Sequence, residues 1–190
     1  MKHILVFLMF LLYSVLCNAD NNIYADCDTQ QIKVLHGGIE VENMKKIVSI
    51  ISANWDVNAV QFHVFCGANL PAFSADNQVY VRHTTINTLT QNELLFVVLH
   101  EYGHIAHQHE QQMQSAILLA RDMFDAEGQQ YLTRCNHSYE FDADAFAVSA
   151  LKKLAVEVKI DVVLHKVLDE KLQSISKTHP SISARAEKFL

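Results

Sequence analysis

Two spacings of apolar residues run along the chain, and each predicts one kind of element. Short strands are predicted at Gln31–Leu35, Val60–Phe65 and Gln78–His83, with a turn-rich loop at Asn69–Asn77. Apolar residues three and four positions apart predict helices after Thr90 and at Glu40–Ala53, Glu110–Tyr131, Ser138–Val158, Asp161–Ile175 and Ser181–Leu190. We expect the helix at Glu110–Tyr131 to break near Gly128. Strands early and helices late predict an α+β fold.

The helix after Thr90 is predicted to be buried. Thr90 and Glu93 have the spacing of a capping box, in which each side chain accepts a hydrogen bond from the other residue's backbone. The following turns, residues 94–99, are apolar nearly all round. A helix with that pattern lies in the interior of a protein.

This buried helix continues into His100, Glu101 and His104, which form the pattern H-E-x-x-H. Residues four apart lie on the same face of a helix about one turn apart, so both imidazoles can bind one metal ion. Zinc suits such ligands and keeps an open position for water, which Glu101 can reach as a base. The alternative interpretation is two hydrogen-bonded core histidines beside a chance glutamate.

A third ligand must come from elsewhere in the chain. His107 and Glu110 occupy the positions where a metzincin carries glycine and its third histidine, so Glu110 is a weak candidate. Glu140, on the helix predicted at Ser138–Val158, can complete a site of two histidines and one glutamate. Asp144 lies one turn further on, where it can accept a hydrogen bond from a ligand histidine. The alternative for these two acids is a solvated helix face.

The motifs resemble those of the gluzincin metallopeptidases, specifically the family of HtpX and the CaaX prenyl proteases. That family has H-E-x-x-H on one helix and E-x-x-A-D on the next, matched here by HEYGH at residues 100–104 and EFDAD at residues 140–144. Weaker similarities lie at Asn69–Phe73 with Val79–Val81, and at Thr178–Ser181 with Arg185. The many membrane spans of the larger members are absent, so the chain is more similar to the small soluble members, the minigluzincins.

The resemblance implies a zincin-like fold and zinc-dependent hydrolysis of polypeptides. His100, His104 and Glu140 would hold zinc, and Glu101 would move the proton from the attacking water to the leaving amine. His179 and Arg185 are candidates for a donor to the oxyanion, with Tyr139 behind them. The strand Gln78–His83 is expected to bind an extended substrate along an exposed edge.

Other functions remain open at this point. The chain could be a latent enzyme, or a zinc-holding interaction or chaperone-like module of the same fold. A catalytic thiol at Cys135 beside His137 has nothing to order the pair. His107 and His109 are expected at the solvated, frayed end of the H-E-x-x-H helix.

The first residues have the pattern of a secretory signal. Lys2 precedes the apolar run Ile4–Leu16, which is too short to span a membrane comfortably. We therefore expect residues 1–19 to be a signal peptide cleaved after Ala19, and residues 20–190 to form one exported, periplasmic or secreted domain. An uncleaved N-terminal anchor is the alternative.

Charge and cysteine content limit the partners and the compartment. The chain has 15 Lys and Arg against 21 Asp and Glu, with no basic cluster, which argues against nucleic acid as a partner. Export permits disulfides. Among Cys27, Cys66 and Cys135, the preferred pair is Cys27–Cys66, because it would join the segment before the first strand to the second strand.

Overall fold

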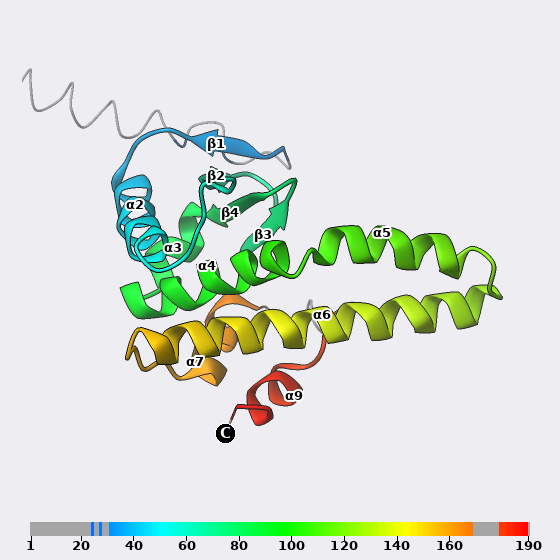
Figure 1. The fold of residues 1–190 in the computed structure, drawn as a ribbon. Coiled ribbons are helices and arrows are strands. Elements are labelled where there is room, and N and C mark those ends of the chain that lie inside the picture. The colour runs from blue at the N-terminus through cyan, green and yellow to red at the C-terminus, as the bar shows by residue number, and fades with distance from the viewer. Residues whose placement is uncertain (1–23, 25–26, 28–30, 169–178, 190) are drawn as a thin grey trace, which may run out of the picture.

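Strands come early in the chain and helices late, which confirms the α+β fold (Figure 1). The computed structural model describes Tyr24, Cys27, residues 31–168 and residues 179–189. The expected signal peptide lies outside the described residues, as does the second half of the helix predicted at Asp161–Ile175.

Four strands form one mixed sheet in the order β1-β2-β4-β3. Neighbours β2 and β4 are parallel, and the other two pairs are antiparallel. The strands are β1 (Lys33–Leu35), β2 (Gln61–Cys66), β3 (Ala72–Ala75) and β4 (Gln78–Arg82).

The prediction of Gln78–His83 as an exposed edge is wrong, because β4 lies inside the sheet and β3 forms that edge. The expected loop at Asn69–Asn77 contains this strand. Asp76 and Asn77 both have positive φ, 49° and 59°, a combination that makes a two-residue hairpin turn. The turn formers in this segment therefore build a hairpin between β3 and β4.

Helix α4 (Gln91–Ala106) lies between the sheet and the long helix α6, and it contacts both. Its predicted capping box is present: the Glu93 backbone N–H donates to the Thr90 hydroxyl, and the Thr90 N–H donates to the Glu93 carboxylate. Val98 and Leu99 are fully buried and belong to the same apolar core as the sheet residues Val79 and Val81.

The other described helices surround this centre. They are α2 (Ile39–Ser52), α3 (His83–Thr88), α5 (His109–Ala120), α6 (Asp125–Lys153), α7 (Ile160–Val167) and α9 (Ile182–Glu187). Helix α3 was not predicted. The helix expected at Glu110–Tyr131 is instead divided between α5 and α6.

The break expected near Gly128 is wrong, because Gly128 lies in the first turns of α6. The chain turns earlier, between Ala120 and Asp125. A Cβ at Gly128 would lie 2.9 Å from the carbonyl oxygen of Ala120. This glycine therefore allows α6 to pack closely on the end of α5.

A disulfide ties the segment before β1 to the sheet. Cys27 and Cys66, the last residue of β2, are joined with an S–S distance of 2.04 Å, as predicted.

Within the described part of the chain, no helix combines the length and the apolar character needed to cross a membrane.

Candidate active site

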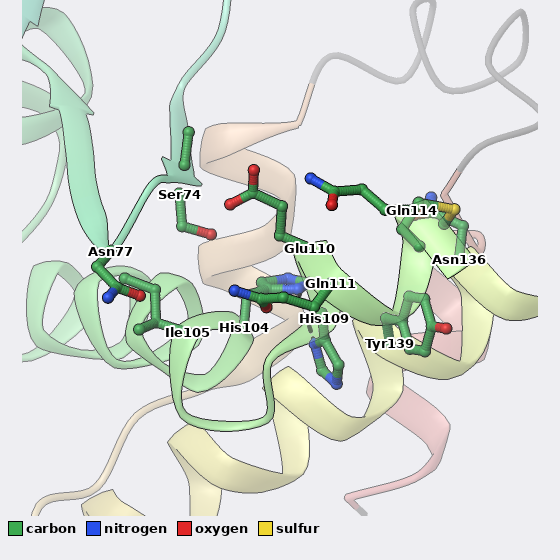
Figure 2. Close-up of a pocket in the computed structure, with 12 residues that line it drawn as sticks. Ser74, Asn77, His104, Ile105, His109, Glu110, Gln111, Gln114, Asn136 and Tyr139 are labelled. Carbon is green, nitrogen blue, oxygen red and sulfur yellow. Dashed lines mark hydrogen bonds between the residues drawn. The ribbon is translucent and has the colours of Figure 1, made fainter. Parts of the chain in front are cut away.

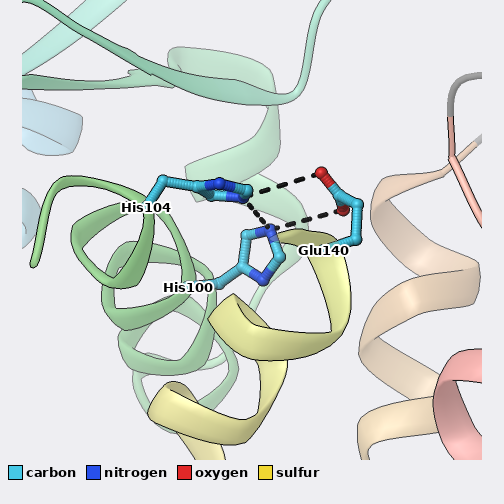
Figure 3. A group of neighbouring side chains, drawn as sticks. All are labelled: His100, His104 and Glu140. Carbon is cyan, nitrogen blue, oxygen red and sulfur yellow. Dashed lines mark hydrogen bonds and ion pairs between the residues drawn. The ribbon is translucent and has the colours of Figure 1, made fainter. Parts of the chain in front are cut away.

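His100 and His104 on α4 face Glu140 on α6, and ligand atoms of the three lie within 4.8 Å of one another (Figure 3). The two Nε2 atoms are 3.2 Å apart. Each of them lies 3.6 Å from one oxygen of Glu140. In a tetrahedral site with bonds of 2.0–2.1 Å, donor atoms are about 3.3–3.4 Å apart. The donor set and its spacing therefore fit one zinc ion.

The meeting of α4 and α6 depends on a residue without a side chain. A Cβ at Gly103 would lie 3.2 Å from Ala143 Cα and 3.2 Å from Phe146 Cβ. Any larger residue would have to push α6 away. Because Glu140 is on α6 and both histidines are on α4, this close approach sets the size of the cluster.

Asp144 lies behind His100 and has no exposed surface. Its Oδ1 is 2.9 Å from His100 Nδ1, the nitrogen that points away from Glu140. Arg185, from α9, donates to both oxygens of Asp144, at 2.8 and 2.7 Å. Burial raises and these hydrogen bonds lower the pKa of Asp144, and the net result is a lowered pKa.

Arg185 also contacts Glu140, with Nη1 3.1 Å from Oε2. Burial would raise the pKa of Glu140, but the hydrogen bond from His179 and the charges of His100 and Arg185 hold it well below its ordinary value. Glu140 is therefore ionised, as a metal ligand must be. The same cluster affects His104, whose pKa falls to about 3 through burial and the neighbouring His100.

Glu101 is buried beside the cluster, at 9% exposure. Burial raises its pKa to about 7, opposed by the charge of His100 and by a hydrogen bond with the Ser74 side chain on β3. A carboxyl group with that pKa can accept a proton near neutral pH and release it again.

His109 is a site residue that the sequence interpretation missed. It is buried, and its Nδ1 lies 3.0 Å from Nδ1 of His104 (Figure 2). The expectation of a solvated, frayed end holds for His107, which is exposed, but is wrong for His109. Gln108 adopts left-handed backbone angles, φ 56° and ψ 38°, which fold the chain back at this point. No glycine marks that turn in the sequence, so spacing alone could not reveal it.

The remaining candidates lie around the cluster at different distances. His179 Nδ1 is 3.3 Å from Glu140 Oε1, and its side chain is 43% exposed. Tyr139 stacks on His109, with ring centroids 4.6 Å apart (Figure 2). Glu110 accepts a hydrogen bond from the Asp76 backbone at 3.0 Å and is not one of the three converging residues.

Two cavities open along the edge strand β3, and Ser74 and His104 line both. The first also contains His100, Glu101 and Glu140 in its lining. The first, of about 300 Å³, lies beside the start of β3. Apart from the cluster, the residues that line this cavity are mostly apolar and include Phe96, Val97, Leu164, Val167 and Leu168. The second, of about 280 Å³, lies beside the end of β3 (Figure 2). Its polar lining includes Asn77, Glu110, Gln111, Gln114 and Asn136.

Comparison with models of known protein families identifies relatives of this chain. The family model described as peptidase family M48 matches residues 40–190. That range includes both helices of the cluster and the sheet strands β2, β3 and β4. A search of curated proteins found no match to the chain.

Proposed function

Since the chain belongs to peptidase family M48, a family of zinc-dependent metallopeptidases, we propose that it is a zinc endopeptidase of the HtpX and CaaX prenyl protease type. His100, His104 and Glu140 would hold the metal. The observation that carries this proposal is the 3.2–3.6 Å spacing of their donor atoms, which matches a tetrahedral zinc site.

Zinc, when bound, would acidify a water molecule and polarise a peptide carbonyl. Glu101 takes the proton of the attacking water and delivers it to the leaving amine. Its burial and raised pKa suit both steps, because the group must gain and lose a proton at one pH.

His179 is the better placed candidate to donate a hydrogen bond to the oxyanion. It lines the apolar cavity beside Glu140 and is partly exposed, so its ring can face a bound substrate. The guanidinium of Arg185 is already occupied by Asp144 and Glu140. We therefore assign Arg185 to holding these two carboxylates in place.

The substrate would be an extended polypeptide that adds to the free edge of β3. Main-chain hydrogen bonds along an edge strand provide affinity without requiring a particular sequence. Ser74 is on this strand and contacts Glu101, so a peptide bound there passes next to the proposed base.

The test is metal analysis of the purified protein combined with casein digestion, with and without a chelator. We expect about one zinc per chain and activity that the chelator abolishes. Less than a fifth of an equivalent of zinc would refute the proposal. Glu140→Gln should weaken zinc binding much more than the matched Glu110→Gln, and equal losses would mean that the third ligand is misassigned.

Glu101→Gln distinguishes an enzyme from a zinc-holding interaction module. The variant should keep its zinc and its fold but lose turnover by 10²–10⁴-fold, about 3–5 kcal/mol in the barrier. Retained zinc together with retained activity would exclude Glu101 as the base. If the wild-type protein binds zinc but cleaves nothing, the interaction module is the correct interpretation.

We also propose that the protein is exported and that residues 1–19 are its signal peptide. The Cys27–Cys66 disulfide supports an oxidising compartment. Mass spectrometry of the protein from an exporting host should find a mature chain that begins at Asp20. An intact Met1 would favour the membrane-anchor alternative.

A further inference from the structure

Each of the two cluster histidines has one ring nitrogen that faces Glu140 and one that faces away. The outward nitrogen of His100 contacts Asp144, a carboxylate that can only accept. The outward nitrogen of His104 contacts a third histidine: Nδ1 of His104 and Nδ1 of His109 are 3.0 Å apart. At this distance one of the two nitrogens must carry the proton and the other must be bare.

The position of that proton decides whether His104 can bind a metal. A neutral imidazole has one N–H and one lone pair. If His104 donates from Nδ1 to His109, its Nε2 is bare and faces His100 and Glu140. If His109 is the donor, Nδ1 of a neutral His104 is bare and its one proton is on Nε2. That proton would block the nitrogen that has to bind the metal.

We propose that His109 is the positioning residue for His104: its bare Nδ1 accepts a hydrogen bond from the Nδ1–H of His104 and so leaves His104 Nε2 free for zinc. The proposal rests on the zinc site proposed above. It gives the two histidines different supports, a buried carboxylate for His100 and a neutral ring for His104. Such outer partners orient a ligand and raise its basicity.

The surroundings of His109 hold its ring in the required orientation. His109 is 5% exposed, and its ring stacks on two others. Tyr139 stacks on it with centroids 4.6 Å apart and planes 19° apart, and His107 does so at 5.4 Å and 20°. The left-handed turn at Gln108 places His109 at the start of α5, folded back against His104. Three independent features therefore fix one hydrogen bond.

Two substitutions separate the hydrogen bond from the packing. His109→Phe keeps an aromatic ring that can stack on Tyr139 and His107 but has no acceptor. His109→Asn loses the ring, while its Oδ1, as many bonds from the backbone as histidine Nδ1, can still accept. His107→Phe is the matched control, since His107 also stacks on His109 but is not one of the three converging residues.

The measurement is the zinc dissociation constant of each variant, from competition with a chromogenic chelator. We expect His109→Phe to weaken binding 10- to 100-fold, and His109→Asn and His107→Phe to stay within a few-fold of wild type. Wild-type affinity in His109→Phe would overturn the proposal. Equal weakening in His109→Phe and His109→Asn would also overturn it, because packing would then be the cause.

Nitrogen NMR of the zinc-loaded wild-type protein gives a second readout that does not depend on activity. His104 should show its proton on Nδ1, and His109 should show a bare Nδ1. A proton on Nδ1 of His109 would contradict the assignment. Failure of the proposed zinc site is distinct from both results, because there the wild-type protein itself would take up no zinc.

Discussion

At the scale of single residues, Asp144 joins the proposed ligand His100 to the buried cation Arg185. Asp144→Asn should weaken zinc binding 10- to 100-fold, because the charged acceptor beside His100 becomes a neutral and weaker one. The variant should also unfold at a lower temperature, since the buried charge of Arg185 keeps only Glu140 as its anionic partner. Zinc titration and thermal unfolding measure the two effects.

Asp142→Asn is the control for that experiment. Asp142 is on the same helix, two residues away, but its side chain is exposed. It should leave zinc affinity and thermal stability unchanged. The alternative interpretation of this helix, a solvated acidic face, is wrong for Glu140 and Asp144, because both side chains are buried. Equal zinc affinities of the two variants would leave Asp144 with no role in the site.

Residue spacing predicted those site residues whose positions depend on helix geometry alone. His100 and His104 lie one turn apart on α4, and Glu140 and Asp144 lie one turn apart on α6, so the sequence indicates which pairs share a face. The proximity of Asp144 to His100 followed from the same reasoning. His109 escaped prediction because its place depends on the backbone angles of Gln108, a residue type with no preference for the left-handed conformation.

At the scale of secondary-structure elements, the crossing of α4 and α6 controls the metal cluster through Gly103. Gly103→Val would place side-chain atoms against the backbone of Ala143. Overpacking of this kind costs about 1–3 kcal/mol. Since it also moves Glu140 away from the two histidines, we expect both a lower melting temperature and weaker zinc binding.

Gly128→Val provides a matched comparison at the other end of α6. Its new side chain would meet the Ala120 carbonyl, where α5 and α6 join, away from the cluster. The variant should lose stability but keep its zinc affinity. If Gly103→Val and Gly128→Val reduce zinc affinity equally, general destabilisation and not the helix crossing would be the cause.

Periodicity predicted the helices with strong local signals and failed where tertiary contacts decide. The start of α4 was clear because the Thr90 capping box is local. Strand β3 was hidden, since its four residues, Ala72–Ala75, are all half-buried and show no alternation. The division between α5 and α6 was misplaced because Gly128 serves close packing there and not a chain break.

At the scale of the whole molecule, the Cys27–Cys66 disulfide closes a loop with a sequence separation of 39 residues. Cross-linking a loop of this size stabilises a folded chain by about 4 kcal/mol, mainly by restricting the unfolded state. That is a large part of the roughly 5–15 kcal/mol typical of a domain. Urea unfolding should therefore show a much lower midpoint for Cys27→Ser/Cys66→Ser than for the wild type.

The third cysteine of the described residues serves as the control. Cys135 is free, so Cys135→Ser should unfold at the wild-type urea concentration. A reducing agent should shift the midpoint of Cys135→Ser and leave the double variant unchanged. If Cys27→Ser/Cys66→Ser unfolds at the same urea concentration as the wild type, the disulfide does not form in the purified protein.

The unlike cavities along the edge strand β3 give the bound polypeptide a polarity. Strand β3 runs from the apolar cavity toward the cavity that has amide side chains in its lining. A peptide paired antiparallel to β3 would have its amino-terminal half among amide side chains and its carboxy-terminal half in the apolar cavity. New amino termini produced by cleavage would then begin with apolar residues. Sequencing the products of an unbiased peptide mixture would thus reveal which way the substrate threads through the enzyme.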